Sequence, residues 1–221
     1  MYNKKNNQDK IGHWGDIIKT KMNIIEKFAG KKVLDVGCST GDYVIYLNNH
    51  GYDAYGCDIS KNKLWMRKPS KFKIGNIYKL PYRKNSFDTV IALEIFEHLD
   101  NPELALKEIR RVANKNIILS VPNCELPSVF YHAGLSFYHH IDKTHINRFI
   151  EKDIKELLVK NNYKVDFFKL LSPIRPAILF LYTSHFPLFL ATFIGKVISK
   201  MPTSKKIYSD MLIVASINKN L

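Results

Sequence analysis

The chain has 221 residues, with 34 lysines and arginines against 20 aspartates and glutamates, which gives a formal net charge of +14. Its composition, 46% hydrophobic and 24% charged, is that of an ordinary globular protein and excludes the disordered and collagen-like classes. The three cysteines form no CxxC pair, so the sequence favours neither a disulfide framework nor a thiolate zinc site, and the polar N-terminus does not resemble a signal peptide.

Strand and helix patterns alternate through the first half of the chain. A helical repeat of apolar residues over 17–28 stops at Gly30, and an apolar run over 32–36 predicts the first buried strand. Alternating strands and helices predict an α/β, Rossmann-like, doubly wound and mostly parallel sheet that binds ligands at the carboxyl ends of its strands. The elements expected after the first strand are a helix over 43–49, a strand over 54–59, a basic helix over 60–67, strands over 72–74 and 89–93, a helix over 102–112 and a strand over 116–121.

The second half adds a helix over 151–161 and two strands, over 164–170 and 211–217, which complete a seven-stranded sheet. Between those strands lies an uncharged segment, 176–195, about as long as the ~20 residues that a membrane span needs. The strands on either side should belong to one sheet, and a single crossing would separate them across the bilayer. We therefore expect an apolar helical insertion before the last strand, either buried against the body of the protein or dipped into a membrane interface.

The positive charge is concentrated in two segments. Residues 59–87 and 167–209 together hold fifteen basic residues and no acidic one, whereas the rest of the chain is close to balance. The second segment brackets the apolar insertion, and an apolar helical element with basic flanks is typical of contact with an anionic membrane surface. We therefore expect a cytoplasmic protein that is peripheral at the membrane, with RNA as the second choice of anionic partner.

Two features at the predicted strand ends favour a nucleoside ligand. The turn from Gly37 to Gly41 has the pattern GxxxG, which lets backbone N–H groups approach a ligand closely, and it matches neither GxGxxG nor GxxxxGK[ST]. Asp58 ends the next strand at about the distance where a carboxylate accepts both hydroxyls of a ribose. Taken alone, an aspartate at a strand end could equally be a turn or cap residue.

Five motifs in order along the chain carry a family resemblance. They are VLDVGCSTG (33–41), GCDIS (56–60), LPYRKNSFD (80–88), EIFEHL (94–99) and SVPN (120–123). In these motifs and their spacing the sequence resembles the class I S-adenosylmethionine-dependent methyltransferases, in particular their type 11 branch. The resemblance implies a methyltransferase whose cofactor is S-adenosylmethionine.

The resemblance also implies which residues bind the cofactor. Asp35 and the backbone of the glycine turn would hold its methionine end, Asp58 its ribose hydroxyls, and residues around Ile59 and Asn76 its adenine. Three apolar members of the set, Ile59, Ile77 and Leu93, could equally be core residues. The complete set is Asp35, Gly37, Cys38, Ser39, Gly41, Asp58, Ile59, Asn76, Ile77, Leu93 and Glu94.

The sequence departs from the family pattern at three places. Ser39 stands where the family most often has glycine, Asn76 replaces an aspartate, and residues 113–116 replace a Pro-Gly-Gly turn. The serine side chain is small, and the asparagine oxygen can still accept a hydrogen bond from an exocyclic amine. We expect cofactor binding to survive all three changes.

Methyl transfer is an in-line displacement in which the protein aligns the acceptor and removes its proton. His145, in the segment 142–149, follows the fifth strand and is the first candidate for the general base; the alternative is a histidine that fixes this loop by hydrogen bonding. His98 is the second candidate. The sequence predicts no metal site, because three further histidines lack partners at a spacing such as HExxH: His132, His139 and His140.

The expected reaction is O-methylation of a small, glycan or lipid-linked acceptor. Aromatic residues within 129–138 could line the acceptor pocket or belong to the core. The alternatives are an RNA methyltransferase and a binding protein that keeps the fold without catalysis. We expect one methyltransferase domain over 1–221, with an N-terminal helix or lid (1–30), a cofactor-binding core (31–123), a substrate-side loop region (124–150) and the apolar, basic-flanked insertion (171–206).

Overall fold

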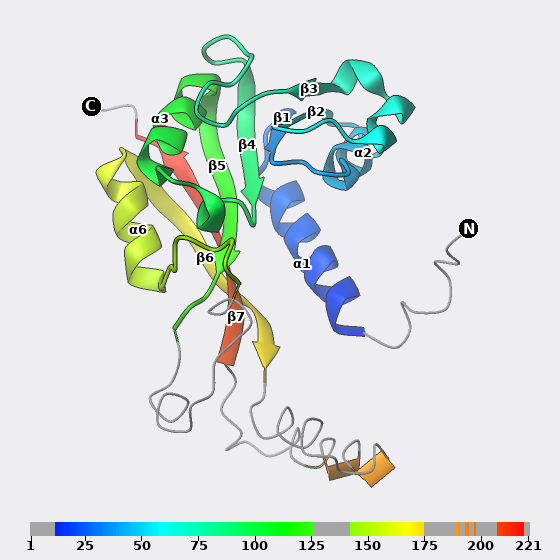
Figure 1. The fold of residues 1–221 in the computed structure, drawn as a ribbon, viewed down its shortest axis with the longest axis vertical. Coiled ribbons are helices and arrows are strands. Elements are labelled where there is room, and N and C mark those ends of the chain that lie inside the picture. Colours follow the sequence, from blue (N-terminus) through cyan, green and yellow to red (C-terminus); the bar gives the residue numbers. More distant parts are fainter. Residues whose placement is uncertain are drawn as a thin grey trace.

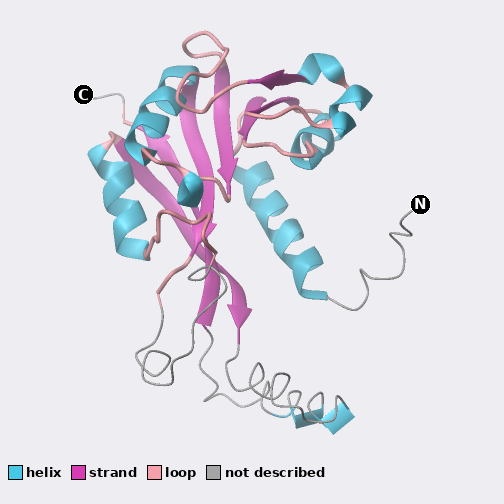
Figure 2. Cartoon of the chain, viewed as in Figure 1, coloured by secondary structure: helices cyan, strands magenta, loops and turns pink. Residues whose placement is uncertain are grey.

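The computed structural model describes residues 12–125, 142–174 and 207–218, together with residues 189–190, 193–194 and 197 of the apolar segment. A central sheet is covered by helices on both faces (Figures 1 and 2). Its strands are β1 Lys32–Val36, β2 Asp53–Asp58, β3 Phe72–Ile74, β4 Phe87–Leu93, β5 Ala113–Pro122, β6 Tyr163–Ile174 and β7 Ile207–Ile217.

The strand order is β3-β2-β1-β4-β5-β7-β6. Neighbouring strands from β3 to β5 are parallel, and β7 runs antiparallel to both β5 and β6. This arrangement confirms the predicted doubly wound, mostly parallel seven-stranded sheet. The helices are α1 Gly12–Phe28, α2 Asp42–Asn49, α3 Pro102–Val112 and α6 Glu151–Lys160, with short 3-10 helices η2 Lys63–Arg67, η3 Pro69–Lys71 and η4 Phe96–His98.

The core consists of two apolar layers, one on each face of the sheet. Successive side chains of a strand point to opposite faces, so neighbours in β1 enter different layers. Leu34 belongs to the layer that contains Ile109 of α3 and Leu158 of α6, whereas Val33 belongs to the layer that contains Ile25 of α1. The apolar runs that predicted buried strands are therefore explained by burial on both faces.

The structure differs from the sequence prediction in the basic segment after β2. A helix was expected over 60–67, but a 3-10 helix spans only Lys63–Arg67. Its start is fixed by Asn62, whose side chain accepts a hydrogen bond from the N–H of Leu64 at 3.0 Å, and Pro69 begins the next 3-10 turn. The local caps thus shorten the helix that the basic composition favoured.

The last two strands are longer than predicted. Strand β7 begins at Ile207 rather than at 211, and β6 continues to Ile174 rather than ending at 170. Over the added length the two strands pair with each other through backbone hydrogen bonds, and the last pair joins Ile174 to Ile207. Because β6 lies at the sheet edge, it also tolerates Pro173, which cannot donate to a ladder.

Most of the predicted insertion over 171–206 lies outside the described residues, as do the aromatic stretch 129–138 and the histidines His132, His139 and His140. The described residues between 189 and 197 are helical. In the part of the chain covered by the structure, no helix has the length and apolar character needed to cross a membrane.

Candidate active site

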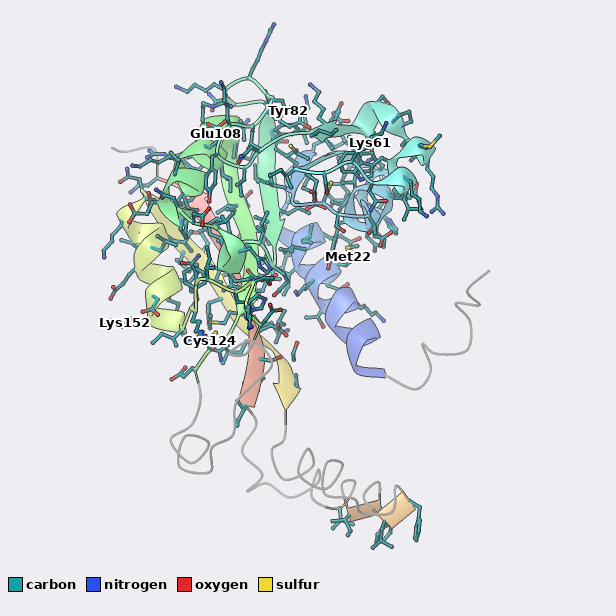
Figure 3. The ribbon with its side chains drawn as sticks, viewed as in Figure 1. Met22, Lys61, Tyr82, Glu108, Cys124 and Lys152 are labelled. Atoms are coloured by element: carbon teal, nitrogen blue, oxygen red, sulfur yellow. The ribbon has the colours of Figure 1, made fainter. Side chains whose placement is uncertain are left out.

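The candidate site lies where the strand order reverses, between β1 and β4. In open α/β sheets, ligands bind at such a switch point, beyond the carboxyl ends of the strands. Asp35 lies near the end of β1, Asp58 ends β2, and Glu94 directly follows β4. Figure 3 shows side chains of α1, where Met22 is labelled, and of the segment after β5, where Cys124 is labelled, on either side of this edge.

The glycine turn after β1 has a backbone that most residues adopt only with strain. Gly37 and Gly41 have φ angles of 75° and 80°, in the left-handed region that glycine tolerates. A Cβ on Gly37 would lie 2.5 Å from Cδ1 of Ile95, and a Cβ on Gly41 would lie 2.5 Å from the ring of Phe72. Glycine at both ends is therefore required by conformation and by space.

Ser39 also has a positive φ of 44°, although it is not glycine. Its N–H donates to Oδ2 of Asp58 at 2.9 Å, and its carbonyl accepts from the indole N–H of Trp65 at 2.9 Å. The Trp65 ring stacks on Phe72 with centroids 5.0 Å apart, so the side chain that donates to the turn is itself held by packing. These contacts explain how serine occupies a position where the family most often has glycine.

Asp58 and Asp35 place two carboxyl groups beside the turn. Asp58 accepts from the N–H groups of Ser39 at 2.9 Å and Ser60 at 3.1 Å, so its orientation is fixed. Asp35 is buried, and this burial together with the nearby Asp58 raises its pKa well above the ordinary value. Burial, with Asp35 next in effect, also raises the pKa of the Cys38 thiol, which therefore stays protonated and does not act as a nucleophile.

Glu94 takes part in a buried polar group that the sequence analysis missed. Nζ of Lys21, in α1, lies 2.7 Å from Oε1 of Glu94 and 3.2 Å from Oγ of Ser120, which in turn donates to the same Glu94 oxygen at 2.6 Å. Lys21 is only 7% exposed. A signal was present, because Lys21 lies four residues before Ile25 on the apolar face of the predicted helix.

Lys21→Met is expected to destabilise the protein by about 1–3 kcal/mol, since it removes a charge-assisted contact and leaves Glu94 without its partner. Urea unfolding of Lys21→Met, Glu94→Gln and the double variant measures the coupling between the two side chains. Lys19→Met, an exposed position on the same helix, is the matched control and should be near wild type. Additive effects of the two changes would contradict the predicted coupling.

The two predicted catalytic histidines lie together, although 46 residues separate them in the chain. The rings of His98 and His145 have centroids 4.8 Å apart, at an interplanar angle of 73°. His98 Nδ1 lies 2.9 Å from the carbonyl oxygen of Thr144, and His145 Nε2 lies 3.7 Å from Oδ2 of Asp142. A carbonyl oxygen only accepts, so Nδ1 of His98 is the protonated nitrogen and Nε2 keeps its lone pair in the neutral ring.

Glu97 is a further residue that the sequence analysis did not select. It is 2% exposed and lies behind His98, with 3.9 Å between its Oε1 and His98 Nε2. Burial and the neighbouring Glu94 raise the pKa of Glu97 to about 8. The pattern EIFEH contained this residue, but nothing in the pattern shows that its carboxyl group is buried.

The remaining residues predicted to contact the cofactor separate into exposed and core positions. Ile59 is 74% exposed, so it is not a core residue, whereas Ile77 is buried in the layer with Leu34. Leu93 is partly buried against the layer on the α1 side. Asn76 is exposed, and its Oδ1 accepts from the N–H of Tyr78 at 2.9 Å.

Comparison with solved structures defines the class of fold. Magnesium protoporphyrin IX methyltransferase from Synechocystis PCC 6803, with bound SAH, aligns with a TM-score of 0.62 over 99% of this chain and 89% of that one, at 18% sequence identity. A structure described as a complex between the Haloferax volcanii Trm112 methyltransferase activator and "the putative methyltransferase" aligns with a TM-score of 0.63 over 97% of this chain and 93% of that one, also at 18% identity. The chain therefore has the fold of the class I S-adenosylmethionine-dependent methyltransferases.

Sequence comparison then shows which known proteins the central part of the chain is similar to. Residues 34–121 match the family described as "Methyltransferase domain". A sterol 24-C-methyltransferase of Gibberella zeae is 36% identical over 103 residues, which are 42% of this chain and 27% of that protein. The chain thus spans about a quarter of that relative, and 59% of a demethylmenaquinone methyltransferase of Oceanobacillus iheyensis that is 28% identical over 141 residues.

Proposed function

We propose that this chain is an S-adenosylmethionine-dependent methyltransferase that acts on an oxygen atom of its acceptor. The observation that carries the proposal is the set of acidic residues at the switch point, where Asp35, Asp58 and Glu94 follow or end neighbouring strands beside a glycine turn, within a region that matches the methyltransferase-domain family. S-adenosylmethionine carries a sulfonium cation, which these carboxyl groups would attract. The turn matches no phosphate-binding pattern, as a cofactor without phosphates requires.

The residues present fit this cofactor. The carboxylate of Asp58 has acceptor positions left after its bonds to Ser39 and Ser60, so it could take both ribose hydroxyls without moving. Ile59 offers an exposed apolar surface for one face of adenine. The positive φ of Gly37 and the lack of a side chain there would let the backbone lie against the methionine end.

When bound, S-adenosylmethionine supplies the methyl group, whose carbon leaves the sulfonium sulfur as it bonds to the acceptor oxygen. The chain's own contribution is to align that oxygen and to accept its proton. We place this role at the pair of His98 and His145, with His145 as the base. Asp142, 3.7 Å from its Nε2, would stabilise the imidazolium that forms.

For the acceptor, we propose a lipid-linked molecule held at an anionic membrane surface, ahead of a free glycan or another small molecule. Phe189, Phe193 and Val197 are spaced four residues apart and are 72%, 68% and 50% exposed. In a helix this spacing puts them on one face, and an exposed apolar face beside basic residues favours the membrane interface. The basic residues that flank the insertion support the same choice.

Two measurements test the proposal. Calorimetry should show S-adenosylmethionine binding, and methyl transfer from labelled cofactor should be greatest for hydroxyl acceptors presented in anionic vesicles rather than free in solution. His145→Asn should lower kcat by about 100-fold, the usual contribution of a general base, and leave cofactor affinity unchanged. His50→Asn, at the exposed end of α2, is the control. Absent cofactor binding would favour a binding protein that keeps the fold without catalysis.

A further inference from the structure

We infer that Glu97, His98 and His145 form a binding site for a divalent transition-metal ion of the zinc type. One ligand atom from each residue can be chosen so that all three atoms lie within 4.8 Å of one another. The residues come from two separate parts of the chain, η4 and the loop before α6. This inference departs from the expectation of no metal, which rested on three other histidines.

The distance between Glu97 and His98 suits a shared ion better than a direct hydrogen bond. Oε1 of Glu97 and Nε2 of His98 are 3.9 Å apart, too far for a hydrogen bond. Two ligand atoms bound about 2.1 Å from one zinc ion lie about 3.4 Å apart in a tetrahedral site, and at most about 4.2 Å apart in any geometry. The Glu97–His98 pair is therefore within that limit, whereas the full set of three ligand atoms, which lie within 4.8 Å of one another, must draw closer as the ion binds.

Each histidine has a polar group behind it, and the group behind His98 fixes its orientation by a hydrogen bond. Nδ1 of His98 donates to the Thr144 carbonyl at 2.9 Å, which leaves Nε2 as the ligand nitrogen. Asp142 lies 3.7 Å from Nε2 of His145, and its other oxygen accepts from Thr144 at 2.9 Å and 2.7 Å. Carbonyl and carboxylate partners of this kind commonly orient metal-bound histidines and raise their basicity.

The loop is tied to η4 before any ion binds. The N–H of Asn147 donates to the Glu97 carbonyl at 2.9 Å, and its side-chain amide donates to the carbonyls of Phe96 at 3.1 Å and Leu99 at 2.6 Å. These bonds hold His145 next to His98 at little further conformational cost. The three residues are thus arranged for a common ligand by the fold itself.

The carboxyl group of Glu97 is the independent observation that points to an ion. Its Oε2 is buried and, within the described part of the chain, has no hydrogen-bond partner. Such an atom is costly unless something compensates it. Lys21 makes its direct contact with Glu94 rather than with Glu97, so it favours the Glu97 carboxylate only through space and donates no hydrogen bond to it.

Two imidazoles and one carboxylate are ligands of intermediate softness, which suit zinc, cobalt or iron and leave at least one coordination position open. His98, whose side chain is 39% exposed, gives the site access to solvent. At the open position an acceptor hydroxyl would lose its proton more easily than in water. That role rests on the proposed function, and in the metal-loaded protein His145 would be a ligand rather than the base.

The test measures metal binding directly, without cofactor or acceptor. The protein is freed of metal with a chelator and titrated with Zn²⁺ in competition with a chromophoric chelator, and with Co²⁺ while its visible absorption is recorded. We expect one ion per chain and an absorption spectrum of tetrahedral or five-coordinate cobalt. Glu97→Gln, His98→Asn and His145→Asn should each weaken binding at least about tenfold, since changes even to residues behind the ligands cost that much.

His50→Asn is the matched control and should bind as wild type does. S-adenosylmethionine affinity serves as the fold check, because a correctly folded variant should keep it. Wild-type protein that binds no ion, or variants that bind Zn²⁺ as tightly as wild type, would overturn the inference. Metal binding is measured without the cofactor, so it can be absent in a protein that transfers methyl groups, or present in one that does not. The two proposals are therefore tested separately.

Discussion

Asp58→Ala is expected to lower the affinity for S-adenosylmethionine by about 100-fold or more. Hydrogen bonds to a charged group contribute about 1.5–3 kcal/mol each, and Asp58 would make two of them to the ribose. The same carboxylate accepts from the N–H of Ser39, so its loss also releases the turn at a residue with positive φ. Calorimetric titration with the cofactor measures the change.

Two further variants make the Asp58 test specific. Asp58→Asn keeps one acceptor oxygen and should lie between wild type and Asp58→Ala. Asp53→Ala removes a carboxylate at the opposite end of β2, where it pairs with Lys71 at 2.6 Å, and should leave cofactor affinity unchanged. If Asp58→Ala binds the cofactor as tightly as wild type, Asp58 is not part of the site.

The fold was predictable because the strands that form its centre are buried on both faces. Such strands appear in the sequence as apolar runs followed by turn residues, and β1 has the predicted bounds. The edge strand β3, in which only Phe72 is buried, also has the predicted bounds. The ends of β6 and β7 were not predictable, because they are extended by pairing with each other rather than by a local pattern. The 3-10 helix η2 was missed because Asn62 and Pro69, rather than composition, set its limits.

The sequence predicted the site residues that lie at the ends of strands, and it did not predict how the others come together. Asp35 and Asp58 lie beside one turn because parallel strands end at the same edge. Lys21 comes from a helix that packs back on this edge, and its partner Glu94 is 73 residues away. The pairing of His98 with His145 depends on the path of a loop held by Asn147, and no periodic pattern encodes that path.

Asp35 should make cofactor binding depend on pH. Its pKa is raised above the usual value near 3.8 by burial and by Asp58, so a fraction of the free protein carries a proton there at higher pH than usual. The sulfonium cation favours the ionised form, so binding releases that proton. Affinity for S-adenosylmethionine should therefore rise with pH, by at most about tenfold per pH unit. The rise should begin near the pKa of Asp35 in the complex and end near the raised pKa of Asp35 in the free protein, above which the affinity should stay constant.

Asp35→Asn isolates this contribution. The variant should bind S-adenosylmethionine more weakly at high pH and should lose the part of the pH dependence due to Asp35, because an amide does not titrate. Asp42→Asn, which removes an exposed carboxylate in the first turn of α2, should keep the wild-type profile. S-adenosylhomocysteine has no sulfonium charge, so its affinity for wild type should vary less with pH. A pH profile that is the same in Asp35→Asn and wild type would assign the dependence to another group and leave the buried carboxyl of Asp35 with a structural role alone.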